Sequence, residues 1–470
     1  MMTKARTPGM QIPRERRDRN PLITPAGYRR LAAILQHPAA PGWNYTVGDR
    51  IRREDIAAVE ATRADLVRLR ENGSGRPPGR ILEWVQAMQA RVPLFRHALP
   101  DGFDLVRDWA HIPTMSRQDI ALRPEDIVPR DADLDRLIVY DTSGVTGHAI
   151  RVPHHPRAMG QNHPMIEFVL ARYGVRPVFG HETVGCVNVG AQLNTVVFAN
   201  IFSVWNQSGF AKVNLHPHRW DPDKARRFFS DMAPCFLTGD PIGFAGLMQW
   251  EVNIRPAAML STAVALTPAV KTRLESYFRC PVIDTYGSTE TGPVAYANPE
   301  GEGLSILPHD LYVETIDTDG FPVAEGERGE ICVSGGRNPY LPLLRYRTGD
   351  FGRMVWSKSV PSDCTPRIMD LEAREAVAFV AADGTPISPV DIGRVIRQWA
   401  FVQHEFIQHV DRSCSITIRP VAGYPVDAKA MREELETLFG KGIYVDVRVD
   451  EHLGDDRPGG KVVPFRCALA

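Results

Sequence analysis

The chain has 470 residues, of which 43% are hydrophobic and 24% are charged, and its formal net charge is -1. Its composition is ordinary for a globular protein, and the length suggests two to four domains or one large domain with an appendage. So small a net charge argues against a global field that would attract nucleic acid or an anionic membrane, and no apolar run approaches the roughly 18 residues of a membrane span.

The N-terminal segment is basic and has no apolar core of signal-peptide type. It carries Arg14, Arg16, Arg17 and Arg19, and we expect residues 1–20 to form a flexible, solvated tail rather than a binding arm. The seven cysteines are scattered without a CxxC pair. Such cysteine usage suits a reducing cytoplasm and argues against a disulfide framework or a thiolate metal site.

Helices are expected first, and an alternation of strands and helices follows from about residue 137 to 290. Residues 25–95 are predicted to be mostly helical. Beyond them, Thr267 and Pro268 give a strong helix start signal. The expected strands are 137–140, 184–189, 235–239 and 280–287, and the expected helices are 222–233 and 267–278. This alternation predicts α/β layers around parallel strands.

The rest of the chain changes character twice. Residues 311–356 contain strand-like runs and a DG turn, which predict an antiparallel β region. The last hundred residues combine strands at 405–410, 414–421 and 443–449 with helices near 390–400 and 427–439. We therefore predict an α/β protein with a large domain over residues 21–370, made of layered α/β sheets and a β subregion, and a small α+β domain over residues 371–470.

The stretch 139-VYDTSGVTGHAIRV-152 has the glycines and hydroxyls of a phosphate-binding loop. Gly144 and Gly147 are too close for a Walker loop, and no Lys-Ser/Thr pair follows them. The backbone N–H groups and the hydroxyls of Thr142, Ser143 and Thr146 can still wrap an anion in a hairpin-like loop. An ordinary polar hairpin turn explains the same residues equally well.

Three further segments carry residues with chemical potential. In 284-DTYGSTETG-292, Tyr286 can stack on a base and Glu290 can bind a hard cation such as Mg²⁺. In 345-RYRTGD-350, Asp350 can accept both hydrogen bonds of a ribose diol. In 457-RPGGKVVPFR-466, Lys461 is a mobile cation for phosphate or carboxylate oxygens.

Each of these three segments has a plain alternative when taken alone. The first can be a capped loop with a solvated glutamate, and the third can be a frayed basic tail. In the second, Asp350 can lie in a turn and pair with Arg345 or Arg347.

The order and spacing of the four segments resemble the adenylate-forming superfamily of acyl-CoA synthetases and their relatives, and within it the phenylacetate–CoA ligase branch. The resemblance runs from about residue 90 to 466 and includes 112-IPTMSRQDI-120 and 259-MLSTAVALTPAVKTRLESYF-278. It implies an acid–thiol ligase that uses Mg²⁺ and ATP to form an acyl adenylate and pyrophosphate. The acyl group then passes to the thiol of CoA or of a carrier protein, and an aromatic or heteroaromatic acid fits the branch.

The resemblance also implies a role for each matching residue. The phosphate loop would consist of Thr142, Ser143, Gly144, Thr146, Gly147 and His148, and the adenine and acyl pocket would be bordered by Ser261, Thr262 and Ala263. Tyr286, with Gly287 and Ser288, would form the platform for adenine, and Thr289 would lie near the α-phosphate. Glu290 would bind Mg²⁺, and Asp350 and Arg374 would contact the ribose. The acid itself would meet Asn194, Trp205, Phe210 and Asp240, although each of these has a packing or turn role as its alternative.

Lys461 would bridge the attacking carboxylate and the α-phosphate. Two anions must meet in this reaction, so a cation between them lowers the barrier. Because Lys461 belongs to the small domain, that domain must be mobile: it closes for the first step and, in this family, rotates for the second.

Three positions depart from the family pattern. Val145 and His148 stand where the phosphate loop usually has a hydroxyl residue and a lysine, which predicts weaker ATP binding or loss of activity. Ala376 stands at the expected hinge aspartate, which puts the rotation and the thiol step in question. The alternative is therefore a nucleotide-binding or regulatory protein that has lost turnover.

The same reading sets the expected cofactors and partners. Residues 293–310 contain no cysteine, so we expect no zinc. The expected ligands are ATP, Mg²⁺, a small carboxylic acid and CoA or a carrier protein, without nucleic acid or membrane. Whether the chain forms a homodimer is left open.

Overall fold

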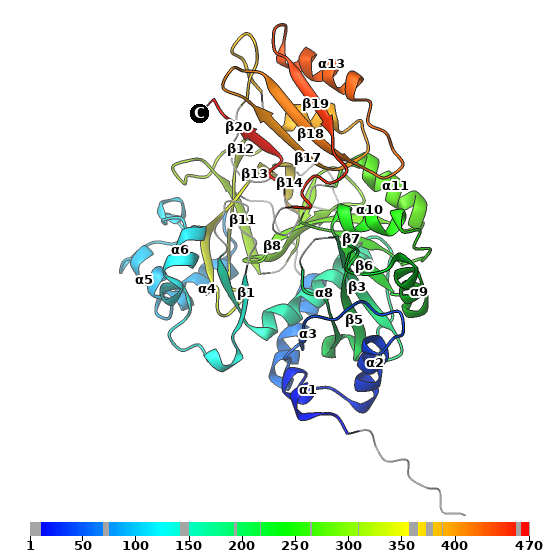
Figure 1. Ribbon diagram of the computed structural model, residues 1–470. Coiled ribbons are helices and arrows are strands. Elements are labelled where there is room, and N and C mark those ends of the chain that lie inside the picture. The colour runs from blue at the N-terminus through cyan, green and yellow to red at the C-terminus, as the bar shows by residue number, and fades with distance from the viewer. Residues whose placement is uncertain are drawn as a thin grey trace, which may run out of the picture.

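The computed structural model describes most of the chain. The described residues are 11–68, 75–141, 150–191, 195–216, 218–263, 266–308, 310–356, 365–372, 379–387, 389–456 and 462–469. Figure 1 shows a large lower part with a long twisted sheet and a smaller upper part that contains the C-terminus.

The N-terminal part is mostly helical, as predicted. Its elements are α1 (Arg14–Arg19), α2 (Pro25–Leu35), α3 (Arg53–Arg68), α4 (Gly79–Gln89), α5 (Pro93–Ala98), η1 (Trp109–His111), α6 (Arg117–Leu122), α7 (Pro124–Ile127) and η2 (Leu134–Arg136). The predicted flexible tail does not reach residue 20. Residues 14–19 are helical, and Asn20 is fully buried where its Nδ2 donates to Oδ1 of Asn200 at 3.0 Å.

Within the described residues, one sheet of twelve strands organises the large part. Its order is β11-β12-β13-β14-β10-β9-β8-β7-β6-β3-β5-β4. The bounds are β3 (Val184–Gly190), β4 (Phe198–Phe202), β5 (Ser208–Asn214), β6 (Phe236–Gly239), β7 (Met259–Ser261), β8 (Val282–Ser288), β9 (Gly292–Ala297), β10 (Leu304–Ile306), β11 (Leu311–Ile316), β12 (Arg328–Gly335), β13 (Leu343–Val355) and β14 (Arg367–Glu372).

Helices cover both faces of the parallel half of this sheet. These are α8 (Pro156–Arg172), α9 (Pro222–Met232), α10 (Pro241–Gln249) and α11 (Pro268–Phe278). Val187, Leu237 and Met259 of the strands share a core with α2, α9, α10 and α11. Neighbouring strand residues such as Cys186 and Phe236 point to the other face, where their core includes α3 and α8. Because successive side chains of a strand alternate between faces, one apolar run supplies both cores.

The helices that follow β5, β6 and β7 begin in the same way. Asp221, Asp240 and Thr267 each precede a proline and cap their helix, with side-chain oxygens accepting from the backbone N–H three residues on, at 3.0, 2.6 and 3.3 Å. Proline suits the first helical position because no N–H is needed there. These caps define where the loop after each strand ends and the next helix begins.

The C-terminal part is built around a second, smaller sheet. It contains β15 (Phe379–Val380), β16 (Pro386–Ile387), α12 (Pro389–Ile396), β17 (Phe401–Gln408), β18 (Cys414–Pro420), α13 (Ala428–Phe439), β19 (Val445–Val449) and β20 (Phe465–Cys467), and the sheet order is β19-β18-β17-β20. These elements confirm the predicted α/β fold with a small C-terminal α+β part.

The two parts touch in this structure. Val402 and Val421 of the small part belong to the core that α10 and α11 share, and the guanidinium of Arg273 lies 4.2 Å from the ring centre of Tyr424. The last strand of the large sheet ends at Glu372, just beyond the boundary predicted at residue 370. That the parts are independent, mobile domains stays a prediction.

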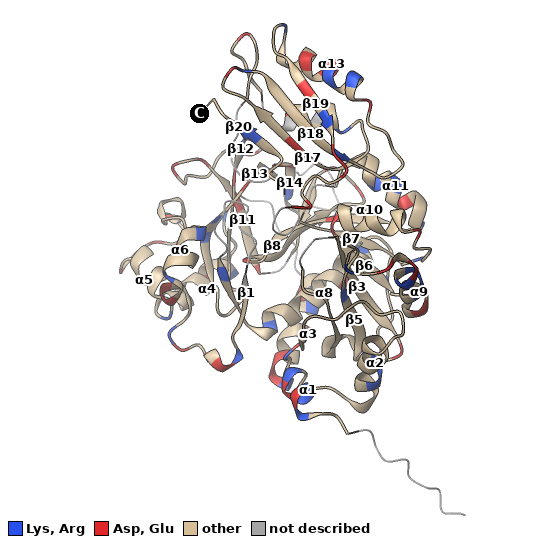
Figure 2. Cartoon of the chain, in the orientation of Figure 1, with Lys and Arg blue, Asp and Glu red and all other residues tan. Residues whose placement is uncertain are grey.

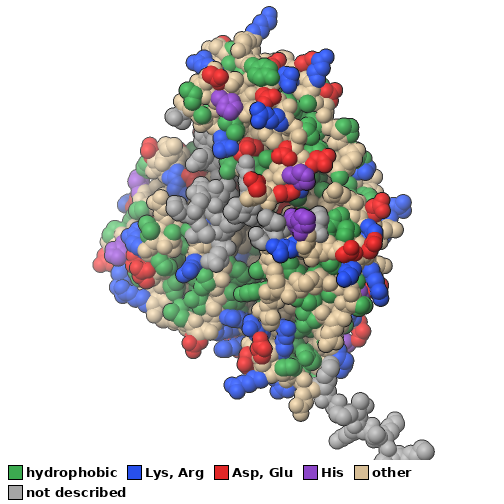
Figure 3. Space-filling model, in the orientation of Figure 1, with side chains coloured by type: hydrophobic (Ala, Val, Ile, Leu, Met, Phe, Trp, Pro, Cys, Tyr) green, Lys and Arg blue, Asp and Glu red, His purple; other side chains and the backbone are tan. Residues whose placement is uncertain are grey.

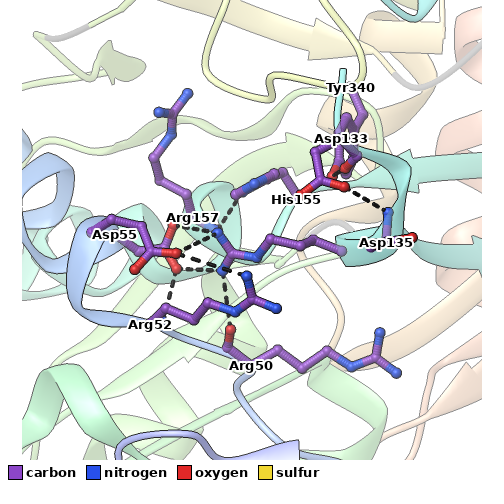
Figure 4. A network of polar contacts seen from close by, with 10 residues as sticks. Arg50, Arg52, Asp55, Asp133, Asp135, His155, Arg157 and Tyr340 are labelled. Atoms are coloured by element: carbon purple, nitrogen blue, oxygen red, sulfur yellow. Dashed lines mark hydrogen bonds and ion pairs between the residues drawn. The ribbon is translucent and has the colours of Figure 1, made fainter. Parts of the chain in front are cut away.

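A two-stranded hairpin, β1 (Ile138–Asp141) and β2 (Arg151–His154), flanks the predicted phosphate loop. An ion pair fixes its base to α3. Arg136 reaches both carboxylate oxygens of Asp55, at 3.1 and 2.5 Å, and donates to the carbonyl of Arg50. The side chains of Arg136 and Asp55 are both buried, so the bidentate pair holds η2 and hence the hairpin in one position. Figure 4 shows Asp55 and Arg50 within this network of polar contacts.

The surface agrees with the near-neutral sequence. Lys, Arg, Asp and Glu are interspersed along the chain (Figure 2), and charges of both signs spread over the face drawn in Figure 3. None of the helices in the described part of the chain has the length and apolarity of a membrane-crossing segment.

Helix α8 contains a proline, and a histidine compensates for it. Pro164 has no N–H for the carbonyl of Gly160, and His163 Nδ1 lies 3.0 Å from that oxygen. The His163 ring also packs edge-on against Phe202 and Trp205, with centroids 4.4 Å apart in each case. Burial lowers the pKa of His163 to about 4, so the ring stays neutral and Nδ1–H donates.

We predict that His163→Phe flattens the acid dependence of stability. The unfolded chain takes up a proton as pH falls below about 6.5, whereas folded His163 resists it until about 4, so stability is lost between these values. In the variant, the slope of the unfolding free energy against pH should lack the contribution of His163, which is at most about 1.4 kcal/mol per pH unit. At pH 7 the variant should be less stable by about 1 kcal/mol, because the carbonyl of Gly160 loses its donor. Urea unfolding at pH 7, 5.5 and 4.5 measures both effects.

The exposed His97→Gln variant is the matched control and should behave as wild type. An unchanged slope in His163→Phe would show that His163 is protonated in the folded protein.

Candidate functional site

The site lies where the parallel strands end. Strand β8 pairs in parallel with β7 through Asp284, and from Thr285 onward it pairs antiparallel with β9. Its second half therefore extends past the edge at which β6 and β7 stop, and carries 284-DTYGSTETG-292 with it. Gly287 is required there, because a Cβ atom would collide with the carbonyl oxygen of Gly292. Crevices at such a change of pairing are common ligand sites in α/β sheets.

The second and third motifs meet through one hydrogen bond. Tyr286 Oη donates to Asp350 Oδ2 at 2.9 Å and lies 3.4 Å from Thr348 Oγ1. Burial, together with the negative charge of Asp350, raises the pKa of Tyr286 well above its usual range. The phenol therefore remains a donor, and it fixes one oxygen of the carboxylate. Ring and carboxylate thus lie next to each other, although they come from strands far apart in the sheet order.

The segment 345-RYRTGD-350 lies inside strand β13 rather than in a turn. Gly349 has φ +75° and Arg345 has φ +47°, and the pairing with β12 is irregular at this point. The alternative in which Asp350 pairs with Arg345 or Arg347 is not supported. Arg345 pairs with Glu314 at 3.0 Å and Arg347 with Glu330 at 2.5 Å. Both arginines thus hold the strand, whereas Asp350 faces Tyr286.

Glu290 is the buried acid of the site, with 4% of its side chain exposed. Its Oε1 accepts from Tyr346 Oη at 3.3 Å and lies 3.5 Å from Arg117 Nη1. Arg117 begins helix α6, which Ser116 and Asp119 cap reciprocally. The site therefore includes an arginine that sequence reasoning did not single out, although it lies in 112-IPTMSRQDI-120.

The same segment is attached to β13 by backbone hydrogen bonds. The N–H of Met115 donates to the carbonyl of Arg345 at 3.0 Å, and the N–H of Arg347 donates to Met115 at 2.8 Å. This bridge places Arg117 beside the loop that carries Glu290. Three separate sequence motifs thus converge within hydrogen-bonding distance of one another.

The strand after the predicted phosphate loop reaches the same place. His154, at the end of β2, has its pKa lowered to about 4 by burial, against the opposing influence of the Thr289 backbone and of the Glu290 charge. A neutral imidazole there adds no positive charge beside Glu290. Residues 142–148 themselves lie outside the described residues, so their predicted role is not tested.

Some buried polar atoms of the described residues in this part of the protein have no hydrogen-bond partner. Ser261 Oγ at the end of β7 and Asn162 Oδ1 on α8 accept or donate no hydrogen bond among the described residues. Such atoms are unfavourable unless a ligand or water engages them. Thr285 Oγ1 donates to the carbonyl of Ser261 at 2.7 Å, which ties β7 to the Tyr286 strand. A polar ligand at this edge would satisfy them.

Several other predicted residues lie along this edge. The N–H of Thr262 donates to the carbonyl of Gly239 at 2.9 Å, and Ala263 follows with φ +71°, an uncommon conformation for alanine that occurs at functional sites. Asp240 caps α10 through the N–H of Gly243. Ser288 accepts from the N–H of Thr291 at 3.2 Å, which shapes the turn before Glu290.

Trp205, which was predicted to contact the acid, does not lie at this edge of the sheet. It follows β4, which runs antiparallel to β5, so it lies at the opposite edge of the parallel strands. Its indole N–H donates to Glu167 at 2.8 Å, its ring stacks on Phe179, and it is 2% exposed. Trp205 is a core residue here, and a contact with the substrate is not supported. Phe210 contributes to the same core and packs against Phe202 with centroids 4.9 Å apart.

Asn194, Arg374, Ala376 and Lys461 lie outside the described residues.

Comparison with known proteins gives a consistent picture. A family model described as AMP-binding enzyme matches residues 111–338. Over 294 residues the chain is 26% identical to the indoleacetate–CoA ligase of Aromatoleum aromaticum, with 56% of this chain and 54% of that protein covered. Over 93 residues it is 34% identical to the phenylacetate-coenzyme A ligase of Escherichia coli, with 19% of this chain and 21% of that protein covered. The match thus spans about half or less of these relatives.

Solved structures share the fold. A crystal structure of 2-hydroxyisobutyryl-CoA ligase, in the postadenylation state in complex with 2-HIB-AMP, superposes with a TM-score of 0.62 at 15% identity, covering 82% of this chain and 88% of that one. The matched motifs, the fold and the geometry of the crevice agree, and the chain belongs to the AMP-binding, adenylate-forming superfamily.

Proposed function

We propose that this protein activates a carboxylic acid with ATP, forming an acyl adenylate and pyrophosphate, and passes the acyl group to a thiol. The observation that carries the proposal is the meeting of Tyr286, Asp350 and Glu290 in one crevice. An aromatic ring, a diol-accepting carboxylate and a buried acid for a cation are the groups that adenine, ribose and the metal-bound phosphates need. The membership of the superfamily points to the same chemistry.

In the first half-reaction, a carboxylate oxygen of the acid attacks the α-phosphorus of ATP and pyrophosphate leaves. Asp350 would hold the ribose, with one of its oxygens already fixed by Tyr286. Thr289, whose side chain is exposed at the crevice, would donate to the α-phosphate. Positioning of this kind supplies much of the acceleration of phosphoryl transfer, because the reacting groups must align.

Glu290 fits a role as the Mg²⁺ ligand. Both of its contacts, with Tyr346 and with Arg117, use Oε1, which leaves Oε2 for a cation. Mg²⁺ is commonly held in nucleotide sites by one or two carboxylates together with the phosphates, so a single buried acid suffices. When bound, the metal would offset the negative charge of the leaving pyrophosphate. Arg117 would hold the direction of the Glu290 carboxylate.

The thiol step rests on family membership and on the relatives whose names are CoA ligases. CoA is therefore the acceptor we favour over a carrier protein. An aromatic or heteroaromatic acid is consistent with the indoleacetate–CoA and phenylacetate-coenzyme A ligases. Lys461 would bridge acid and α-phosphate, as the resemblance implies, since a cation between two anions lowers the barrier to their contact.

The second candidate is a nucleotide-binding protein without turnover. His148 and Ala376, which replace the usual lysine and hinge aspartate, favour it. Pyrophosphate exchange separates the two functions. An adenylating enzyme incorporates labelled pyrophosphate into ATP when its acid is present. A protein that only binds the nucleotide incorporates no label with any member of a panel of aromatic, heteroaromatic and aliphatic acids.

We predict that Asp350→Asn weakens AMP binding about tenfold or more. The carboxamide can still accept from Tyr286, so the fold should be preserved, but a neutral group forms weaker bonds to the ribose diol. A tenfold loss corresponds to about 1.4 kcal/mol. Titration calorimetry with AMP measures it, and Asp319→Asn in an exposed turn is the control. Equal affinity in both variants would place the ribose elsewhere.

We predict that Lys461→Ala reduces pyrophosphate exchange by roughly 100-fold, because the approach of carboxylate to phosphate loses its cation. The midpoint of thermal unfolding should shift little, since we expect a lysine of the glycine-rich stretch 457–461 to contribute no core packing. Lys441→Ala, which removes an exposed lysine of the small part, should keep full exchange. Normal pyrophosphate exchange in Lys461→Ala would show that the small part does not contribute Lys461 to the first half-reaction.

A further inference from the structure

Two buried polar side chains stand next to each other in the bend between β12 and β13. Arg337 and Asn338 are each 5% exposed. They contact different segments of the chain, since Arg337 bonds to the turn that follows Glu290 and Asn338 bonds to strand β2, which follows the predicted phosphate loop. One short bend therefore reaches two of the segments that the proposed function assigns to ATP.

The guanidinium of Arg337 holds the backbone of the turn after the buried acid. Its Nη1 donates to the carbonyl of Thr291 at 3.2 Å and also to the carbonyl of Pro293, and its Nε donates to Asp310 Oδ1 at 2.9 Å. The charge of this buried arginine is therefore paired. Gly292 lies between the two carbonyls with φ +66°, and a Cβ atom there would lie 3.4 Å from Nη1. The guanidinium thus spans the three residues that directly follow the acid.

Hydrogen bonds between Ser288 and Thr291 close the same turn. The N–H of Ser288 donates to Thr291 Oγ1 at 3.1 Å, and the N–H of Thr291 donates to Ser288 Oγ at 3.2 Å. Glu290 lies between these residues, so its backbone is held both by these bonds and by Arg337. Contacts of this kind behind a metal ligand commonly determine the metal affinity, because they fix the direction of the ligand.

Asn338 holds strand β2 through the backbone as well. Its Nδ2 donates to the carbonyl of Pro153 at 2.7 Å, and its Oδ1 accepts from the N–H of His155 at 3.2 Å. His154 stands between these two anchored residues, and the charge of Glu290 acts on its ring. The returning strand of the hairpin and the turn with the buried acid are therefore both attached to one bend.

We propose that Arg337 and Asn338 form a positioning clamp for the metal-bound phosphates of ATP. Arg337 holds the turn that carries Glu290, and Asn338 holds β2, which continues from the predicted phosphate loop. The clamp rests on the proposed function and deepens it, because the metal and the triphosphate are ligands of that function. AMP has no β- or γ-phosphate and needs no Mg²⁺, so its binding depends on Tyr286 and Asp350 and not on the clamp.

Two nucleotides distinguish a clamp from a general support of the fold. Calorimetry measures the affinity for AMP without metal and the affinity for α,β-methylene ATP, which cannot release pyrophosphate, with Mg²⁺. In Arg337→Lys the ammonium keeps the pair with Asp310 but cannot reach both carbonyls, because it lacks the planar fork of arginine. The affinity for the ATP analogue should fall about tenfold or more, whereas the affinity for AMP should stay within about twofold.

Asn338→Ala provides a second variant that leaves every charge in place. It should show the same selective loss, and it tests the clamp even where Arg337→Lys does not fold. Arg63→Gln is the matched control, because Arg63 forms a bidentate pair with Glu167 between α3 and α8, at 2.9 and 3.0 Å. This control should lower the midpoint of thermal unfolding and leave the ratio of the two affinities unchanged.

The outcomes separate the clamp from the proposed function. When wild type binds both nucleotides and the clamp variants keep the same ratio of affinities, the clamp is overturned and the proposed function stands. An equal loss for both nucleotides also overturns the clamp, because it marks a support of the fold alone. The same holds when Mg²⁺ adds nothing to the binding of the ATP analogue by wild type. Wild type that binds neither nucleotide contradicts the proposed function itself, and the clamp with it.

Discussion

The change of partner along strand β8 determines where the segments 284–292 and 345–350 meet. Through Asp284 the strand is the last member of a parallel, fully covered sheet, and from Thr285 it joins an antiparallel one. The neighbours β6 and β7 stop at the change, held by the caps on the helices that follow them. The polar segment 284–292 therefore projects past the ends of β6 and β7, and the Tyr286–Asp350 hydrogen bond spans from one half of the sheet to the other.

A buried charge marks one part of this site. Glu290 is buried beside Arg117 and Tyr346, so its carboxylate has a cationic neighbour and a hydroxyl donor. Buried charges are retained in proteins when they are paired or functional. Under the proposed function, the same carboxylate faces the metal-bound polyphosphate.

The sequence predicted the parts of the fold that local rules decide. The helices α9 and α11 follow from apolar periodicity, α11 also from its Thr-Pro start, and the strands β3, β6 and β8 follow from short apolar runs. Tertiary context decided the rest. Asp350 lies within β13 because irregular pairing lets the strand continue through a glycine in a left-handed conformation, which the pattern does not reveal. Trp205 lies in the core because β4 runs opposite to its neighbour, and strand direction is not written in the segment itself.

The candidate site was predicted in outline but not in its supporting contacts. Tyr286, Glu290 and Asp350 followed from motif order, whereas Arg117 did not, because a lone arginine gives no local signal until the fold brings its neighbours together. A crystal structure with a hydrolysis-resistant acyl sulfamoyl adenosine tests the central claim most directly. The account predicts its adenine on Tyr286 and its ribose hydroxyls on Asp350. Density for the adenosine in any other cavity would contradict it.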